Sequence, residues 1–207
     1  MRYGHFYLSP IGYLYVLKND YADLNQLYPG SSIINAFNSL ILDYIARQKV
    51  GGTHVNFFHV DQFPFPTPDD FTEEHDSFIR PRVLELSFTA QDMGSLASDL
   101  GWSGNPFKWD PERRFLIQCE LDAFYAHLYG LKREEWQFVL DPQDIHGVSY
   151  PGEAFRVLRE KETLKYGEFR TKRVCLQAYD EMARARRIGA KYHSIVDPPP
   201  GSAKAAW

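Results

Sequence analysis

The sequence predicts an α+β fold that is predominantly α-helical, with a small β element followed by a helical C-terminal region. Residues 12–17 and 53–60 are rich in β-branched and aromatic side chains, which favours strands. From about residue 82 onward the apolar residues recur at helical spacing. Between these parts, residues 63–68 carry a proline at every second position, and each proline keeps its predecessor out of the helical region. We therefore expect two domains, residues 1–67 and residues 68–207.

The most regular helical pattern covers residues 33 to about 48. Ser31 or Ser32 is expected to be its N-cap, because a serine hydroxyl accepts a free N–H of the first turn. Cations near its end suit the helix dipole, and Gly51-Gly52 offers a residue free to take positive φ and end the helix. One apolar stripe runs along it, formed by Ile33, Ile34, Phe37, Leu40, Ile41, Tyr44 and Ile45.

Five more helices are expected after the proline run. Asp110 followed by Pro111 is typical of a helix start, and Gly130 occupies a position typical of a helix end. The tail from Asp197 to Trp207 is expected to be loose. The five predicted helices span about 82–100, 112–129, 132–140, 154–162 and 168–187.

The composition is that of a globular chain. Of the 207 residues 44% are hydrophobic and 24% are charged, which is enough apolar material for a core without metals or disulfides. No apolar run approaches the roughly 18 residues of a membrane-spanning helix, and the N-terminus lacks the order of a secretory signal. We expect a cytoplasmic protein. Cys119 and Cys175 are compatible with a disulfide, but two buried thiols are the simpler interpretation.

The net charge of −4 conceals an asymmetry along the chain. Residues 61–122 hold 13 acids and 5 bases, whereas residues 156–191 hold 11 bases and 5 acids. Basic surface is therefore expected near the C-terminus, with Arg170, Lys172 and Arg173 as candidate phosphate contacts. A solvated helix face has the same composition, and the sequence leaves both interpretations open.

The motifs of several catalytic sites are missing. A nucleoside-methylating enzyme needs a glycine-rich turn for S-adenosylmethionine and an Asn/Asp-Pro-Pro-aromatic loop for a flipped adenine. Residues 104–107 lack the second proline of that loop, and residues 197–200 carry proline where the aromatic ring belongs. No lysine follows an acid by two positions, as a metal-dependent nuclease requires. We therefore expect no catalytic, cofactor-binding or metal-binding residue in this chain.

Polar groups do concentrate where the first helix gives way to the predicted strand. Cations contact phosphates, amides and hydroxyls pair with base edges, and paired glycines let backbone amides approach a phosphate closely. The alternative is a helix-ending turn whose polar residues are incidental, and the sequence favours neither. The candidate nucleic-acid-binding residues of this turn are Arg47, Gln48, Lys49, Gly51, Gly52, Thr53, His54 and Asn56.

The order of motifs from about residue 33 to residue 200 resembles the C-terminal region of bacterial N6-adenine DNA methyltransferases fused to restriction–modification functions, and of related phage-defence methylases. Residues 38–64 resemble the end of that family's target-recognition region. The downstream motifs that match its order are residues 84–90, 99–101, 106–110, 113–114, 120–123, 128–131, 166–173 and 197–200. Residues 1–30 fit the family poorly, which puts Met1 in doubt as a natural start.

The resemblance implies which partners this chain works with, but it assigns the chain no catalytic residue. It implies that residues 1–67 end a DNA target-recognition domain and that the partners are double-stranded DNA and a catalytic methyltransferase domain or polypeptide. The parent enzymes use S-adenosylmethionine, but their methyl-donor and adenine-gripping motifs have no counterpart here, so this chain is expected to be inactive alone. The alternative is a helical protein–protein interaction module of a defence complex without direct DNA contact.

Overall fold

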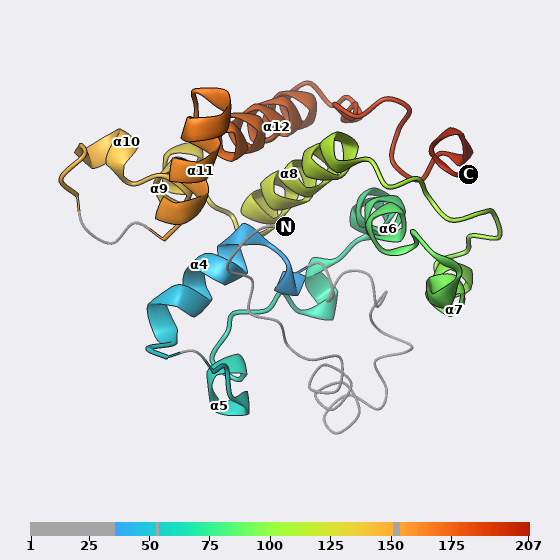
Figure 1. The fold of residues 1–207 in the computed structure, drawn as a ribbon, viewed down its shortest axis with the longest axis horizontal. Helices are drawn as coiled ribbons and strands as arrows, with labels where there is room; N and C mark the ends of the chain where they lie inside the picture. The colour runs from blue at the N-terminus through green and yellow to red at the C-terminus, as the bar shows by residue number, and fades with distance from the viewer. Residues whose placement is uncertain (1–35, 53, 151–153) are drawn as a thin grey trace.

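The computed structural model describes residues 36–52, 54–150 and 154–207, and this part of the chain is predominantly helical (Figure 1). It contains no strand, and one isolated bridge pairs Phe107 with Ala206. The helices are α4 (Leu40–Lys49), α5 (Phe57–Val60), α6 (Glu73–Ser87), α7 (Gly94–Asp99), α8 (Pro111–Leu128), α9 (Arg133–Leu140), α10 (Gln143–His146), α11 (Arg156–Tyr166) and α12 (Arg170–Arg187), with short 3-10 helices at Pro68–Asp70, Gln91–Met93 and Ala203–Ala205.

Helix α8 lies at the centre of the core. Its residues 119–126 are all buried, so neighbouring elements cover it on every side. Helix α12 packs along it, and α4 and α6 also contact it. Because Glu120 and Asp122 are among the buried residues, these carboxylates need partners inside the protein.

Helix α4 starts later than the sequence pattern predicts. Its N-cap is Ser39, whose hydroxyl accepts the N–H of Leu42, and the carboxylate of Asp122 accepts the N–H of Leu40 at 2.8 Å. Leu40 and Ile41 are buried in the main core, which confirms the central part of the predicted stripe. The serines and isoleucines expected to open this helix, at residues 31–34, lie outside the described residues, as do the expected strand at 12–17 and Thr53.

The predicted strand over residues 53–60 is not formed in its described part. Residues 54–56 have no regular structure and Phe57–Val60 is a single helical turn. The N–H of Asn56 donates to Nδ1 of His59, and the N–H groups of His59 and Val60 donate to the carbonyl of Asn56. These local bonds satisfy the backbone without a neighbouring strand, which explains why β-branched and aromatic composition alone was misleading here.

The predicted helix over residues 82–100 is replaced by two shorter helices. Helix α6 begins nine residues earlier, where Thr72 caps it by accepting the N–H of His75, and it continues through Pro81 to Ser87. Proline usually interrupts a helix, but packing against α8 sustains α6 here. The segment after α6 turns at Phe88, and α7 follows as a separate helix.

The later helices agree with the sequence pattern within a few residues. Helix α8 starts as predicted, with the Asp110 carboxylate accepting the N–H groups of Glu112 and Arg113 and with Pro111 in the first turn. Gly130, which follows α8, has a positive φ of 69°, as is typical of a glycine after a helix. Helices α9, α11 and α12 occupy the regions predicted for them.

Residues 192–207, which we call the tail from here on, pack against the protein, so the expectation that residues 197–207 are loose was wrong. Val196 and Ala206 are buried, and the N–H of Trp207 donates to the carbonyl of Pro106 at 3.0 Å. The N–H of Gly201 donates to the Glu85 carboxylate at 2.9 Å. Backbone hydrogen bonds and a buried carboxylate therefore hold a segment whose prolines alone suggested disorder.

One core joins the two sides of the predicted boundary near residue 67. Ala36, Leu40 and Ile41 belong to the same buried cluster as residues from α6, α8, α9 and α12. The boundary itself stays a prediction, because residues 1–35 lie outside the description. Among the described helices, none is long and apolar enough to cross a membrane.

Candidate nucleic-acid interface

The turn after α4 is anchored by its first residue. The guanidinium of Arg47 donates to the Asp43 carboxylate at 2.8 and 3.2 Å and lies 5.6 Å from the ring centroid of Phe155. Only 30% of the Arg47 side chain is exposed. Arg47 is therefore fixed between α4 and the start of α11, and a phosphate would have to share it with Asp43.

Most of the described residues that follow Arg47 in this turn are exposed. Val50 is buried and ends α4 with an extended backbone, while neither Gly51 nor Gly52 takes positive φ, so the expected glycine stop was wrong. A Cβ atom built on either glycine would meet nothing within 4 Å, which leaves their backbone open to approach. The solvent-exposed candidates are Gln48, Lys49, Gly51, Gly52, His54 and Asn56.

The charge around this turn favours an anionic partner. The sequence holds no acid between Asp43 and Asp61, and Asp43 is already paired with Arg47. Lys49 is exposed at the carboxyl end of α4, and among the described residues it has no ion-pair partner. The turn thus presents one cation, amide groups and open backbone to solvent.

The three candidates at the start of α12 have acidic partners. Arg170 pairs with Glu112 and lies over the Phe115 ring, with 16% of its side chain exposed. Lys172 lies 3.0 Å from a carboxylate oxygen of Asp141 and 3.2 Å from one of Asp144. A phosphate would therefore have to compete with these acids for Arg170 and Lys172.

Arg173 is the most accessible of the three. It donates to both oxygens of the Glu168 carboxylate, at 2.9 and 3.0 Å, yet 51% of its side chain is exposed. Exposed ion pairs contribute little to stability, so Arg173 can exchange Glu168 for a phosphate at low cost.

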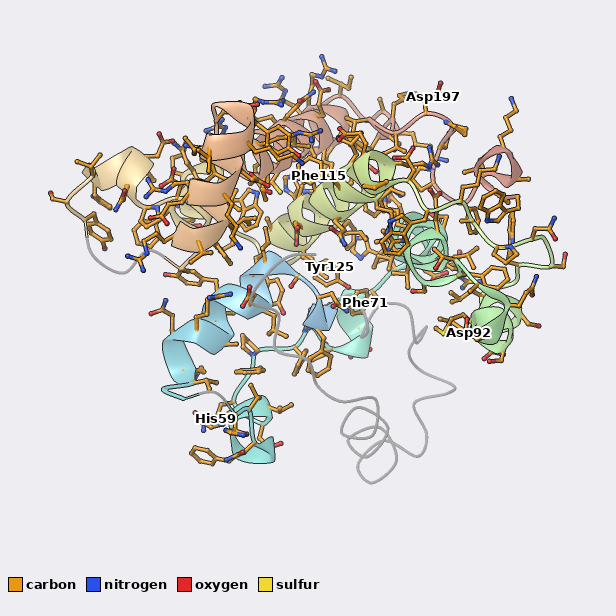
Figure 2. The ribbon with its side chains drawn as sticks, viewed as in Figure 1. His59, Phe71, Asp92, Phe115, Tyr125 and Asp197 are labelled. Carbon is orange, nitrogen blue, oxygen red and sulfur yellow. The ribbon has the colours of Figure 1, made fainter. Side chains whose placement is uncertain are left out.

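The turn and the start of α12 do not form one surface. In Figure 2, His59, which accepts the N–H of Asn56, lies at the lower edge of the molecule. Phe115, against which Arg170 packs, lies in the upper half of the view, and Tyr125 on α8 lies between the two in height. The candidates that sequence reasoning grouped by residue type therefore belong to separate parts of the protein.

Sequence reasoning missed a buried carboxylate that joins three segments. Glu120 on α8 is fully buried and pairs with Arg82 on α6 at 2.9 Å. The tail adds three donors to the same carboxylate, namely the hydroxyls of Tyr192 and Ser194 and the N–H of Ile195, at 2.7–2.8 Å. Burial lowers the pKa of Arg82 and raises that of Tyr192. No sequence signal marks such a group, because its partners lie 38 to 75 residues away.

A second buried carboxylate repeats this arrangement. Glu85 on α6 pairs with Arg113 on α8, and it also accepts the N–H of Gly201 in the tail. Both carboxylates are buried inside the protein. Glu85 and Glu120 therefore hold α6, α8 and the tail together rather than face a substrate.

Within the described residues, no group of His, Cys, Asp and Glu is arranged to hold a metal ion. Cys119 and Cys175 are thiols that form no disulfide, and both are fully buried, which confirms the interpretation as buried thiols. Comparison with protein-family models, curated proteins and solved structures gives no match.

Proposed function

We propose that this chain is the DNA target-recognition and scaffolding C-terminal part of an S-adenosylmethionine-dependent N6-adenine DNA methyltransferase of a restriction–modification or phage-defence system. The ordered series of motifs from residue 38 to residue 200 supports this proposal. In it, a catalytic methyltransferase domain or polypeptide binds S-adenosylmethionine, and this cytoplasmic chain contributes contacts to double-stranded DNA. The proposal also assigns a small β element of the target-recognition domain to the region before residue 67.

The observation that carries the proposal is the exposed turn after α4. Six of its eight candidate residues are exposed, and Arg47 and Val50 fix its start against the core. A rigid base with exposed amide, imidazole and ammonium groups is suited to reading DNA, because positioned side chains lose little freedom on binding. We assign phosphate contact to Lys49 and base-edge contact to Gln48 and Asn56.

The start of α12 has a smaller part in this proposal. Arg170 and Lys172 hold α12 to α8 and to the end of α9 through their acidic partners. Arg173 is the residue of this group that we assign to phosphate contact.

The test is a salt titration of duplex binding by the chain together with the catalytic methyltransferase domain. Lys49→Ala should lower the slope of log affinity against log salt by about one unit on all sequences. Asn56→Ala should leave the slope unchanged and cost about 1–3 kcal/mol on the preferred site only. Lys204→Ala, which changes an exposed lysine in the tail, is the control and should bind like the unmodified chain. If Lys49→Ala and Asn56→Ala also bind like the unmodified chain, the turn has no part in DNA recognition.

A protein–protein module without DNA contact is the second candidate. Large apolar side chains are exposed on and around α10 and α11, with Val148 87% and Leu164 90% exposed. Exposed apolar side chains of this size favour contact with another protein. If the chain binds the catalytic domain but shows no affinity for DNA at low salt, this second function replaces the first.

A further inference from the structure

The carboxyl end of α12 carries a group of cations that differs from those at its start. The group comprises Arg184, Arg186, Arg187 and Lys191, and we call it the α12-end patch. No acid occurs in the sequence between Glu181 and Asp197. All four residues of the patch are exposed, and the Arg184 side chain is 64% exposed.

The ion pairing of α12 is uneven along its length. Its three cations at the amino end all have acidic partners, as described above. At the carboxyl end Arg184 pairs with Glu181, and Arg186 contacts His127 at 3.4 Å. Within the described part of the chain, no carboxylate pairs with Arg186, Arg187 or Lys191. Within α12, the cations without an acidic partner therefore lie at the carboxyl end.

The backbone holds these cations in place. Tyr179 and Met182 bury the preceding turn of α12 in the core. At the helix end Gly189 takes φ 65°, and the N–H of Ala190 donates to the carbonyl of Ala185 at 2.9 Å. This hydrogen bond over five residues is a Schellman-type end, which fixes where the chain goes next. Arg184 and Arg187 are neighbours on the helix surface because they are three residues apart.

The neighbouring acids do not cancel the charge of the patch. Asp180 pairs with Arg133, which already offsets its charge. Glu181 offsets one of the four cations. The carboxyl end of a helix carries about half a negative charge, which is also less than the patch supplies. A net positive surface remains.

We propose that the α12-end patch is a second DNA-contacting surface, which binds the phosphates of duplex DNA without reading their sequence. This inference rests on the proposed function. Arginine is suited to phosphate because its planar guanidinium donates two parallel hydrogen bonds. Residues 182–196 contain no Asn or Gln, the side chains best suited to reading adenine edges. The patch therefore adds affinity and salt dependence rather than target choice.

The test uses the 207-residue chain with a fluorescent duplex and measures anisotropy over a range of salt concentrations. Arg187→Gln/Lys191→Gln should lower the slope of log affinity against log salt by about two units, equally on unrelated duplexes, because each phosphate contact contributes about 0.9. Arg156→Gln/Lys165→Gln is the matched control, since it removes the same charge from exposed positions on α11, to which no DNA contact is assigned. Thermal unfolding of each variant checks that the fold is retained.

The outcomes separate this inference from the proposed function. A slope that falls equally in the patch variant and the control means that total charge alone matters, and it overturns the inference. An unchanged slope in the patch variant combined with a lower slope in Lys49→Ala overturns the inference and keeps the proposed function. Absence of DNA binding by the chain at low salt overturns both. Equal binding to poly-glutamate of matched charge assigns the patch to an acidic protein instead.

Discussion

Glu120 shows how a single buried charge can organise this protein. It has no contact with solvent, and five donors from α6 and the tail surround its two oxygens. A buried carboxylate is costly unless its charge is paired and its lone pairs are satisfied. Both conditions are met here, so the stability of the fold depends on the partners of Glu120 more than on the ion pair alone.

Removal of one partner should therefore be strongly destabilising. Arg82→Ala leaves Glu120 buried without its cation, and we expect a loss of about 3–5 kcal/mol in the free energy of unfolding, measured in urea. Arg133→Ala is the control, because it breaks an exposed pair with Asp180 and should cost no more than about 1 kcal/mol. Similar losses for both variants would show that the buried partners of Glu120 contribute no more to stability than an exposed ion pair does.

His127 should make stability depend on pH. Its ring stacks on Tyr179 with a centroid distance of 3.8 Å. Burial lowers the pKa of His127, and the positive charge of the nearby Arg186 lowers it further. Because the folded-state pKa lies below the unfolded one, the neutral ring favours the folded protein. This stability is fully present above the unfolded pKa of about 6.5 and is lost as the pH falls toward the folded pKa.

His127→Gln should remove this part of the pH dependence. When the pH is lowered from 7.5 to 5, the free energy of unfolding should fall more in the unmodified protein than in the variant. Denaturant titration at each pH measures this difference. The shift can also be read directly from the titration of the His127 ring by NMR. A midpoint at or above the ordinary histidine value would contradict this account.

For the helices, local sequence signals predicted where α8 begins, whereas packing between segments distant in the sequence could not be predicted. Asp110 with Pro111 placed the start of α8 correctly, because caps and first-turn prolines act within a few residues. Helix α6 crosses Pro81, and the turn at residues 57–60 replaced a predicted strand. Those differences depend on which neighbour covers the segment, which one sequence does not reveal.

The candidate site could also be predicted only where its signal is local. The exposed turn after α4 was found from its residue types, since exposed polar residues at a helix end are a local pattern. The pairing of Arg170 with Glu112, across 58 residues, has no local signature. For this reason the sequence alone could not show that Arg170 already has an acidic partner.

Two glycines, Gly201 in the tail and Gly130 after α8, offer a matched pair of substitutions. Gly201 and Gly130 have φ values of 78° and 69°, so alanine at either position costs about 1–2 kcal/mol of backbone strain. A Cβ at Gly201 would also lie 2.6 Å from Cβ of Pro81, whereas one at Gly130 meets nothing within 4 Å. Gly201→Ala should therefore lower the urea midpoint clearly more than Gly130→Ala. Equal midpoints would show that the tail is not packed against α6.

For the whole molecule, the expected absence of methyl-transfer motifs is the most direct prediction. The isolated chain should neither bind S-adenosylmethionine nor methylate DNA, because the cofactor and adenine-gripping motifs are not in its sequence. Calorimetric titration with the cofactor measures the first property, and incorporation of labelled methyl groups into duplex DNA measures the second. Saturable micromolar binding would require a cofactor site of a kind that these motifs do not describe.

The two buried carboxylates also bear on how this protein is made. A ribosome releases the chain from its N-terminus, so α6 and α8 emerge before residues 192–201. Until then Glu120 lacks three of its donors and Glu85 lacks the N–H of Gly201. A chain that has not yet made these contacts therefore holds under-satisfied charges between α6 and α8, and the packing of residues 192–201 satisfies them.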